Sequence, residues 1–273
     1  MNKNAVYGIV MALLIPVISY FLLKKATDNA IVMPRHYIYD SVAENTVNGK
    51  KMVDTIWHTL PPMALTNQLG QKVGWDDIGK KIIVADFFFT HCPTICPRMT
   101  VNMKRLQDGI STISRAGNTP ADFVQFLSFS VDPERDSVPE LKKWADRYQI
   151  DPDSWWLLTG DKKEIYDMSI EHMKVLAQDG KGVDTSFFHT DYMVLIDKDR
   201  HIRGYYHGLD STGIARLSND IVLLSLEKDP KRKSFFAGKL MPLALLFLAT
   251  FLGIGILFFF LKKDKKANES RGS

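Results

Sequence analysis

The sequence from Ile82 to Pro97 reads Ile-Ile-Val-Ala-Asp-Phe-Phe-Phe-Thr-His-Cys-Pro-Thr-Ile-Cys-Pro. Its first half, up to Phe89, is an apolar run that a single aspartate interrupts, a pattern that favours a buried central strand. Apolar side chains at helical spacing follow over 99–113 and predict a helix. Both cysteines of the chain, Cys92 and Cys96, therefore lie in a loop between a strand and a helix.

Strands and helices alternate beyond this loop. Strand patterns lie at 123–131 and 155–158, and helix patterns lie at 137–148, 162–173 and 214–226. Between the last two helices, Tyr192–Asp197 and His201–Tyr206 flank three polar residues and predict a hairpin. This series predicts an α/β fold, with a mixed sheet and flanking helices in one domain over 57–228. Residues 26–56 are weakly patterned, and we expect a linker or irregular arm there.

Two apolar runs near the chain ends, 5–23 and 240–261, contain no charged side chain. Each is long enough to span a hydrocarbon core of about 30 Å as a helix, so both are predicted transmembrane helices. A cleaved signal peptide is the alternative for the first run, but the residues after Leu23 offer no small-x-small cleavage site. The acid-free start is no mitochondrial transit peptide, which favours a bacterial source.

Charge orients this predicted topology. Residues 262–273 form a lysine-rich tail, which the positive-inside rule places in the cytoplasm. Two spans then put the central domain on the periplasmic, extracytoplasmic side of a bacterial inner membrane, although Lys24 and Lys25 favour the opposite orientation more weakly. Between 26 and 238, acidic residues outnumber basic ones, 31 − 2 = 29 against 35 − 9 = 26. The domain therefore lacks the basic surface that nucleic-acid binding requires.

The spacing of Cys92 and Cys96 is compatible with metal binding, thiol exchange or a structural disulfide. A disulfide that closes so short a loop stabilises a fold by only about 2 kcal/mol, which disfavours the structural role. We expect Pro97 to open the following helix and Cys96 to lie in the N-cap region, where the helix dipole stabilises thiolates. Thioredoxin-like redox motifs have two intervening residues, whereas the wider loop here can turn both sulfurs toward one ion.

Two thiolates and one imidazole suit copper, and the seven histidines of the chain are the candidates for the third ligand. His91 neighbours Cys92 but should point away from it in an extended segment, where it would act as a tuning charge. His189 precedes a predicted strand, and such a loop can direct a side chain toward another strand end. The residues alone do not select one histidine.

Four motifs in order, Phe89–Pro97, Ser130–Asp136, Leu158–Gly160 and His189–Thr190 before a strand, resemble the Sco/SenC family. That resemblance covers roughly 57–226 and implies a membrane-anchored, thioredoxin-like copper chaperone for cytochrome c oxidase assembly. It implies three ligands for Cu(I) or Cu(II), namely Cys92, Cys96 and His189. Asp132 is a candidate for tuning the site, but an aspartate before proline is equally a turn residue.

The implied partners are the copper-bearing oxidase subunit, other copper chaperones, thioredoxin-like reductants and membrane lipid. Two departures from the family pattern affect partner docking more than the ligands. Thr94 stands where relatives often have an acidic residue, and relatives usually lack a C-terminal span.

Two other functions compete with metal delivery. The first is a thiol-disulfide oxidoreductase or thiol peroxidase, in which Cys92 attacks and Cys96 resolves the mixed disulfide. The second is a transporter, which is disfavoured because neither predicted span holds an ionisable residue. Copper binding that depends on His189 would separate the chaperone from the oxidoreductase.

Overall fold

The computed structural model describes residues 14–15, 18–22, 33–47, 50–116, 123–175 and 190–227. The chain divides into two compact units, Met1–Glu227 and Lys228–Ser273, and the second lies outside the described residues. All elements below belong to the first unit.

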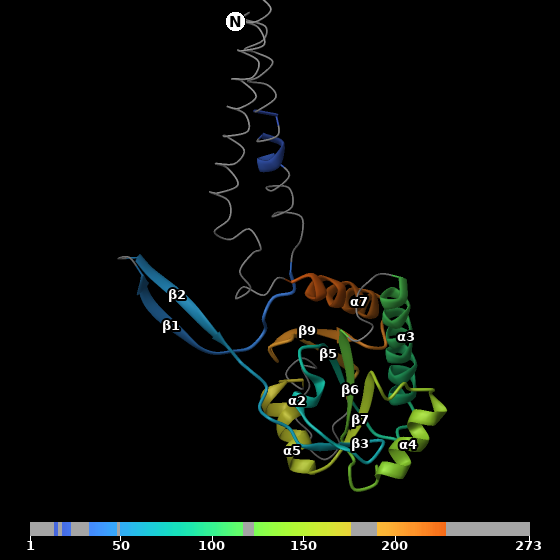
Figure 1. Cartoon of the computed structure of the whole chain (residues 1–273). Helices are drawn as coiled ribbons and strands as arrows, with labels where there is room; N and C mark the ends of the chain where they lie inside the picture. Colours follow the sequence, from blue (N-terminus) through green and yellow to red (C-terminus); the bar gives the residue numbers. More distant parts are fainter. Residues whose placement is uncertain are drawn as a thin grey trace, which may run out of the picture. The chain divides into compact units, whose positions relative to one another are not determined.

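A seven-stranded mixed sheet forms the centre of the domain (Figure 1). Its order is β4-β3-β7-β6-β5-β8-β9, in which β5, β6 and β7 are parallel and the other pairs are antiparallel. The strands are β3 Leu65–Asn67, β4 Lys72–Val73, β5 Ile82–Phe88, β6 Val124–Ser130, β7 Trp155–Thr159, β8 Tyr192–Ile196 and β9 Ile202–His207.

Helices cover both faces of this sheet, with α3 and α4 on one side and α2 and α5 on the other (Figure 1). The bounds are α2 Trp75–Ile78, α3 Ile95–Ala116, α4 Val138–Arg147, α5 Lys162–Asp167 and α7 Ser211–Leu226. Helix α7 contacts β5, β9 and α3. The parallel β5-α3-β6 unit, joined to the β8-β9 hairpin and α7, confirms the α/β class and fits the thioredoxin-like fold that the resemblance implies.

Burial explains why β5 and β6 read as continuous apolar runs. Every residue of both strands is buried, because helices cover both faces of a parallel sheet. Phe126 of β6 packs against Trp155 of β7 with ring centroids 5.9 Å apart. The Trp155 indole N–H donates to Ser128 Oγ at 2.9 Å, so this large core side chain has no unsatisfied donor.

The structure corrects two expectations about elements. Part of the predicted irregular linker over 26–56 is an antiparallel hairpin, formed by β1 Tyr39–Val47 and β2 Lys50–Trp57. Among its described side chains, Val42, Val53 and Ile56 are exposed, so the sequence lacks the alternation that burial of one face produces. The helix predicted over 162–173 is α-helical only to Asp167 and continues as the π-helical turn η1 Met168–His172.

The predicted spans fall largely outside the structure. Residues 14–15 and 18–22 are helical and exposed, and the rest of 5–23 and all of 240–261 lie outside the described residues. Within the described part of the chain, no helix combines the length and the apolar character needed to cross a bilayer.

Candidate metal centre at the start of helix α3

The two cysteines lie at the carboxyl end of β5, where the chain turns into α3. The Cys92 backbone N–H donates to Phe89 O at 3.2 Å, which turns the chain immediately after the strand. Helix α3 begins at Ile95, so Cys96 lies inside the first turn and not at the N-cap as predicted. Pro97 is the third helical residue, and its missing N–H is still one that the first turn leaves unpaired. Both thiols are free and buried.

The loop curls so that the Cys92 sulfur faces the start of the helix. The Cys96 backbone N–H donates to Cys92 Sγ at 3.5 Å, and Thr94 Oγ1 lies 4.0 Å from the same sulfur. Burial raises the pKa of Cys92, but hydrogen bonds from the backbone of Cys96 and Thr94 and from the Cys96 side chain outweigh it. The pKa of Cys92 therefore lies below its usual value, as the predicted helix-terminus effect requires.

Cys96 has the opposite electrostatic character, so the prediction that the start of the helix stabilises its thiolate is wrong for this residue. Burial raises the pKa of its thiol far above the ordinary range, and the adjacent Cys92 sulfur and the Asp86 carboxyl add to the increase. Asp86 is the aspartate that interrupts the apolar run of β5, and its Oδ1 is buried without a hydrogen-bond partner. Burial raises the pKa of Asp86 to about 7. The site thus pairs one readily ionised thiol with one that keeps its proton.

His91 lies in a turn and not in the extended segment that the sequence predicts. Its ring is half exposed, with Nδ1 3.0 Å from Thr90 Oγ1 and 3.8 Å from Asp136 Oδ1. His91 therefore lies beside the cysteine loop, and its role as a charge that tunes the site stays a prediction.

Asp136 is a structural residue of the site that the sequence reasoning missed. Its fully buried carboxylate accepts hydrogen bonds from the Thr90 backbone N–H at 3.2 Å, Thr90 Oγ1 at 2.5 Å and Ser130 Oγ at 2.5 Å. It therefore ties the end of β5 to the end of β6. The sequence did contain a sign of this role, because Asp136 is an acidic residue of the Ser130–Asp136 motif and comes shortly after a predicted strand.

Asp132, by contrast, organises its own turn. Its carboxylate accepts from Arg135 Nε at 2.6 Å, and its carbonyl accepts the N–H groups of Arg135 and Asp136. These contacts match the turn role that the sequence analysis considered.

His189 lies outside the described residues, but the residues directly after it are placed. Thr190 is buried, and the Asp191 carbonyl accepts the Gly208 N–H at 2.6 Å. The Gly208 carbonyl accepts the amide of Asn102 in α3 at 2.7 Å. The entry to β8 is therefore linked through Gly208 to the helix that carries Cys96.

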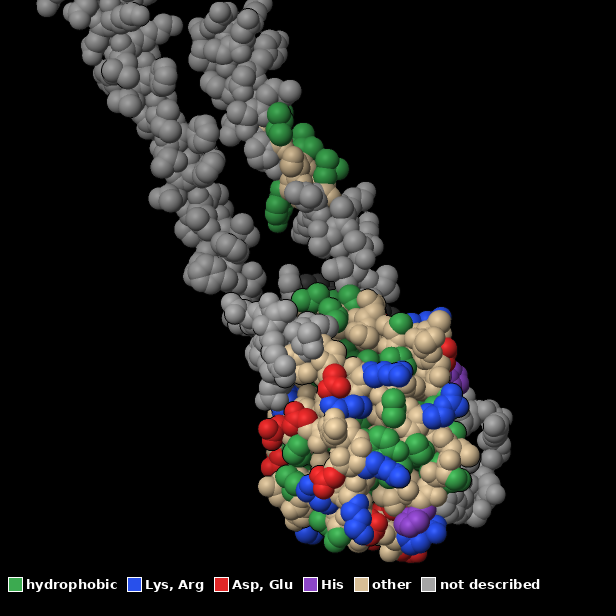
Figure 2. Space-filling view, turned by 90° about the vertical axis from the view of Figure 1, so that its right-hand side faces the viewer, with side chains coloured by type: hydrophobic (Ala, Val, Ile, Leu, Met, Phe, Trp, Pro, Cys, Tyr) green, Lys and Arg blue, Asp and Glu red, His purple; other side chains and the backbone are tan. Residues whose placement is uncertain are grey.

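A groove of about 740 Å³ lies between α3 and the start of α7, and Pro97, the residue after Cys96, is part of its lining. Pro97, Val101 and Leu106 of α3 line one wall, and Leu209, Ile214 and Ala215 line the other. Arg98 and Arg105 also border it. Figure 2 views the side on which α3 lies, and hydrophobic patches alternate there with Lys and Arg.

The arrangement of motifs is matched by a family of known proteins. The model of the SCO1/SenC family matches residues 57–221, which include the cysteine loop, Asp136 and the entry to β8. The chain belongs to the SCO1/SenC family. This confirms the resemblance that the four sequence motifs indicated.

Individual SCO1/SenC relatives agree with this assignment. A SCO1 protein homolog of Bacillus subtilis is 32% identical over 174 residues, 63% of this chain and 86% of the relative. A putative copper-binding protein of Stutzerimonas stutzeri is 26% identical over 169 residues, 60% of this chain and 76% of the relative.

A solved structure of BsSco, described as a member of the Sco family of cytochrome c oxidase assembly proteins with a disulfide switch, is 30% identical. It has a TM-score of 0.52 and covers 64% of this chain and 98% of its own.

Proposed function

We propose that this SCO1/SenC protein is a membrane-anchored copper chaperone, which carries copper as cargo to the binuclear copper site of cytochrome c oxidase. The observation that carries the proposal is the buried dithiol at the start of α3, in which Cys92 is predisposed to ionise. Soft thiolate ligands select Cu(I), and an imidazole adds affinity for Cu(II). The oxidase partner is inferred from the family description attached to BsSco.

The donor set fits a copper ion. Cys92 in the loop and Cys96 in the first turn of α3 supply two sulfurs, and the hydrogen bond of 3.5 Å from the Cys96 backbone N–H to Cys92 Sγ supports their use as a pair. A bound cation would lower the pKa of Cys96, because the ion stabilises its thiolate. Loading copper would therefore release the proton that Cys96 holds in the metal-free protein.

His189 completes the proposed ligand set. Two hydrogen bonds support it, because they link the residues after His189 to α3: the Gly208 N–H donates to the Asp191 carbonyl, and the Asn102 amide donates to the Gly208 carbonyl. Transfer then proceeds by ligand exchange, as incoming thiolates of the oxidase subunit replace Cys92, Cys96 and His189 one at a time.

Thiol-disulfide exchange is a second candidate, and the unequal thiols favour it. Cys92 thiolate would attack one sulfur of a partner disulfide and release the other as a thiolate that takes up a proton. Cys96, after losing its proton, would then attack Cys92 in the mixed disulfide and release the second partner thiol. The partner gains two electrons, and a thioredoxin-like reductant must reduce the Cys92–Cys96 disulfide afterwards.

The predicted spans give the proposed location. Helices at 5–23 and 240–261 would hold the domain on the extracytoplasmic side of a bacterial inner membrane, with residues 262–273 in the cytoplasm. A disulfide can form in that compartment, so copper loading requires that the two cysteines be kept reduced.

Substitution of His189 separates the two candidate functions. In the full-length protein, His189→Ala should lower Cu(II) affinity by at least about 100-fold, since loss of an outer-shell partner alone costs about 10- to 100-fold. Loss of the absorption from thiolate-to-Cu(II) charge transfer would report it, while the rate of dithiol exchange should be nearly unchanged.

His207→Ala is the matched control, because it also removes a histidine near the start of β8 but not a proposed copper ligand. His207 lies at the end of β9 beside Tyr192 and Asp191. The variant should keep the charge-transfer absorption. Equal copper affinity of His189→Ala and the parent would rule out the three-ligand site.

A further inference from the structure

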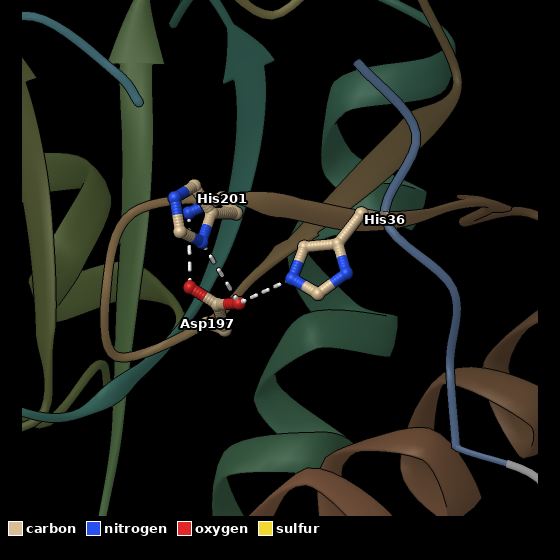
Figure 3. A group of neighbouring side chains, drawn as sticks. All are labelled: His36, Asp197 and His201. Atoms are coloured by element: carbon tan, nitrogen blue, oxygen red, sulfur yellow. Dashed lines mark hydrogen bonds and ion pairs between the residues drawn. The ribbon is translucent and has the colours of Figure 1, made fainter. Parts of the chain in front are cut away.

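Three polar side chains meet where the segment before β1 crosses the β8-β9 turn (Figure 3). His36 Nε2 lies 3.6 Å from Asp197 Oδ2, and His201 Nδ1 lies 3.5 Å from the same oxygen. One ligand atom from each residue lies within 4.8 Å of the others. Asp197 is buried, and the two imidazoles are half-buried around it.

These separations are long for hydrogen bonds and suitable for a shared metal ion. An N–H···O hydrogen bond normally spans about 2.7–3.2 Å. Two ligands that each lie about 2.0–2.1 Å from a tetrahedral ion are about 3.4 Å apart. The distances from Asp197 Oδ2 to the two imidazole nitrogens are closer to the second value.

Outer contacts hold these ligands in position. Asp197 Oδ1 accepts the backbone N–H groups of Asp199 and His201, both at 2.9 Å, which leaves Oδ2 directed at the imidazoles. His201 Nε2 lies 3.2 Å from Thr59 Oγ1. With the proton on Nε2, His201 donates to Thr59 and presents Nδ1 as a ligand. A metal-bound histidine commonly uses its second nitrogen in this way.

His36 is positioned by stacking on Trp57, with ring centroids 4.6 Å apart and planes 16° apart. The ring is thereby held with Nε2 3.6 Å from Asp197 Oδ2.

The charge of the surroundings also suits a cation. Arg203 Nη1 donates to Asp197 Oδ2 at 3.0 Å, but Arg203 is also paired with Glu227 through contacts of 2.7 and 2.9 Å. The two carboxylates and one guanidinium sum to one negative charge. A divalent ion would therefore meet a negative site with two nitrogen donors.

We propose that His36, Asp197 and His201 form a second metal site, which takes a divalent ion of the Zn²⁺ or Cu²⁺ class and is separate from the cysteine pair. Imidazole and carboxylate ligands in this combination suit such ions. The bound ion would fasten the segment before β1 to the β8-β9 turn. That segment already meets β9 through the Tyr37 N–H, which donates to Ile202 O at 3.1 Å.

Zinc binding by the full-length protein tests this site. A Cys92→Ser/Cys96→Ser background removes the thiol ligands, so the outcome is independent of the copper proposal. Equilibrium dialysis should give one Zn²⁺ per chain, and His36→Gln or His201→Gln should each weaken binding by at least about 100-fold, more than the loss of an outer-shell partner costs. Co²⁺ in place of Zn²⁺ should give visible absorption that both substitutions remove.

His207→Gln is the matched control, because His207 also pairs with a carboxylate, Asp191, at 3.1 Å. It should bind Zn²⁺ as the background does, and circular dichroism of all variants should show the same folded content. The proposal is overturned if the background binds no Zn²⁺, if His36→Gln and His201→Gln bind it unchanged, or if all three variants lose it equally.

Discussion

At the scale of single residues, the site depends on the difference between two thiols. Cys92 receives hydrogen bonds from the helix start, whereas Cys96 is buried beside Asp86 and the Cys92 sulfur. The same asymmetry would serve both proposed functions: in copper binding one thiolate would capture the ion first, and in thiol exchange one thiol would attack and the other resolve. Because both candidate functions use the two cysteines, the proposed third ligand, His189, is the residue that distinguishes them.

Alkylation should distinguish the two cysteines. In the reduced, metal-free protein at pH 7, iodoacetamide should modify Cys92 well before Cys96, because the lowered pKa of Cys92 gives it the larger thiolate fraction. Peptide mass spectrometry over time gives both rates. Faster modification of Cys96 would show that the assigned asymmetry is wrong.

Asp86 should make stability depend on pH. The pKa of this carboxyl is about 7 in the folded protein against 3.8 as the reference value. Its contribution to stability is fully present below pH 3.8 and is lost as the pH rises through about 7, because only the folded state retains the proton there. At roughly 1.36 kcal/mol per pKa unit, the loss reaches about 4 kcal/mol.

Asp86→Asn removes this titration. The variant should gain stability over the parent between pH 4 and pH 8, as followed by thermal unfolding. Asp146→Asn, which alters an exposed aspartate paired with Lys142, should show no comparable trend. A constant difference between Asp86→Asn and the parent across this range would contradict the raised pKa.

At the scale of elements, the strand ends build the site. The carboxyl ends of β5 and β6 are adjacent because the strands are parallel, with Phe88 opposite Ser130. Asp136 then joins the Thr90 end of β5 to the Ser130 end of β6. The cysteine loop is thus held by a buried carboxylate and not by the helix alone.

Asp136→Asn should loosen this joint. An amide can accept at only one of its two terminal atoms, and a hydrogen bond to a charged group is worth about 1.5–3 kcal/mol, so we expect a destabilisation of about 2–3 kcal/mol in urea unfolding. Glu134→Gln, on an exposed side chain of the same segment, should change the free energy of unfolding by less than about 0.5 kcal/mol. Equal changes in the free energy of unfolding for the two substitutions would contradict the structural role assigned to Asp136.

Elements with a buried face were predictable from sequence, and the others were not. The apolar runs of β5 and β8 reflect their burial, so the positions of β5 and of the β8-β9 hairpin were predicted within one or two residues. The β1-β2 hairpin exposes Val42, Val53 and Ile56, so its sequence does not show the pattern of a buried face. The cluster of His36, Asp197 and His201 joins residues far apart in sequence, and only the fold brings them together.

At the scale of the whole molecule, the proposed function depends on where the domain lies. The predicted spans at 5–23 and 240–261 would place it on the extracytoplasmic side, where a cysteine pair can be oxidised. Copper capacity and redox state are then linked, because a Cys92–Cys96 disulfide removes both sulfur ligands.

Topology reporters should give opposite results for the domain and the tail. An alkaline phosphatase fusion after residue 227 should be active, because the enzyme requires export to form its disulfides. A fusion at residue 273 should be inactive. Activity of the C-terminal fusion would show that residue 273 is exported, so that either the predicted orientation is reversed or residues 240–261 do not span the membrane.

Anaerobic Cu(I) titration of the full-length protein against a chromophoric Cu(I) chelator tests the central claim most directly. We expect the reduced protein to take one Cu(I) per chain from the chelator, and both the disulfide form and Cys92→Ser/Cys96→Ser to take none. Failure of the reduced protein to bind Cu(I), or equal uptake by the disulfide form, would contradict a copper chaperone built on Cys92 and Cys96.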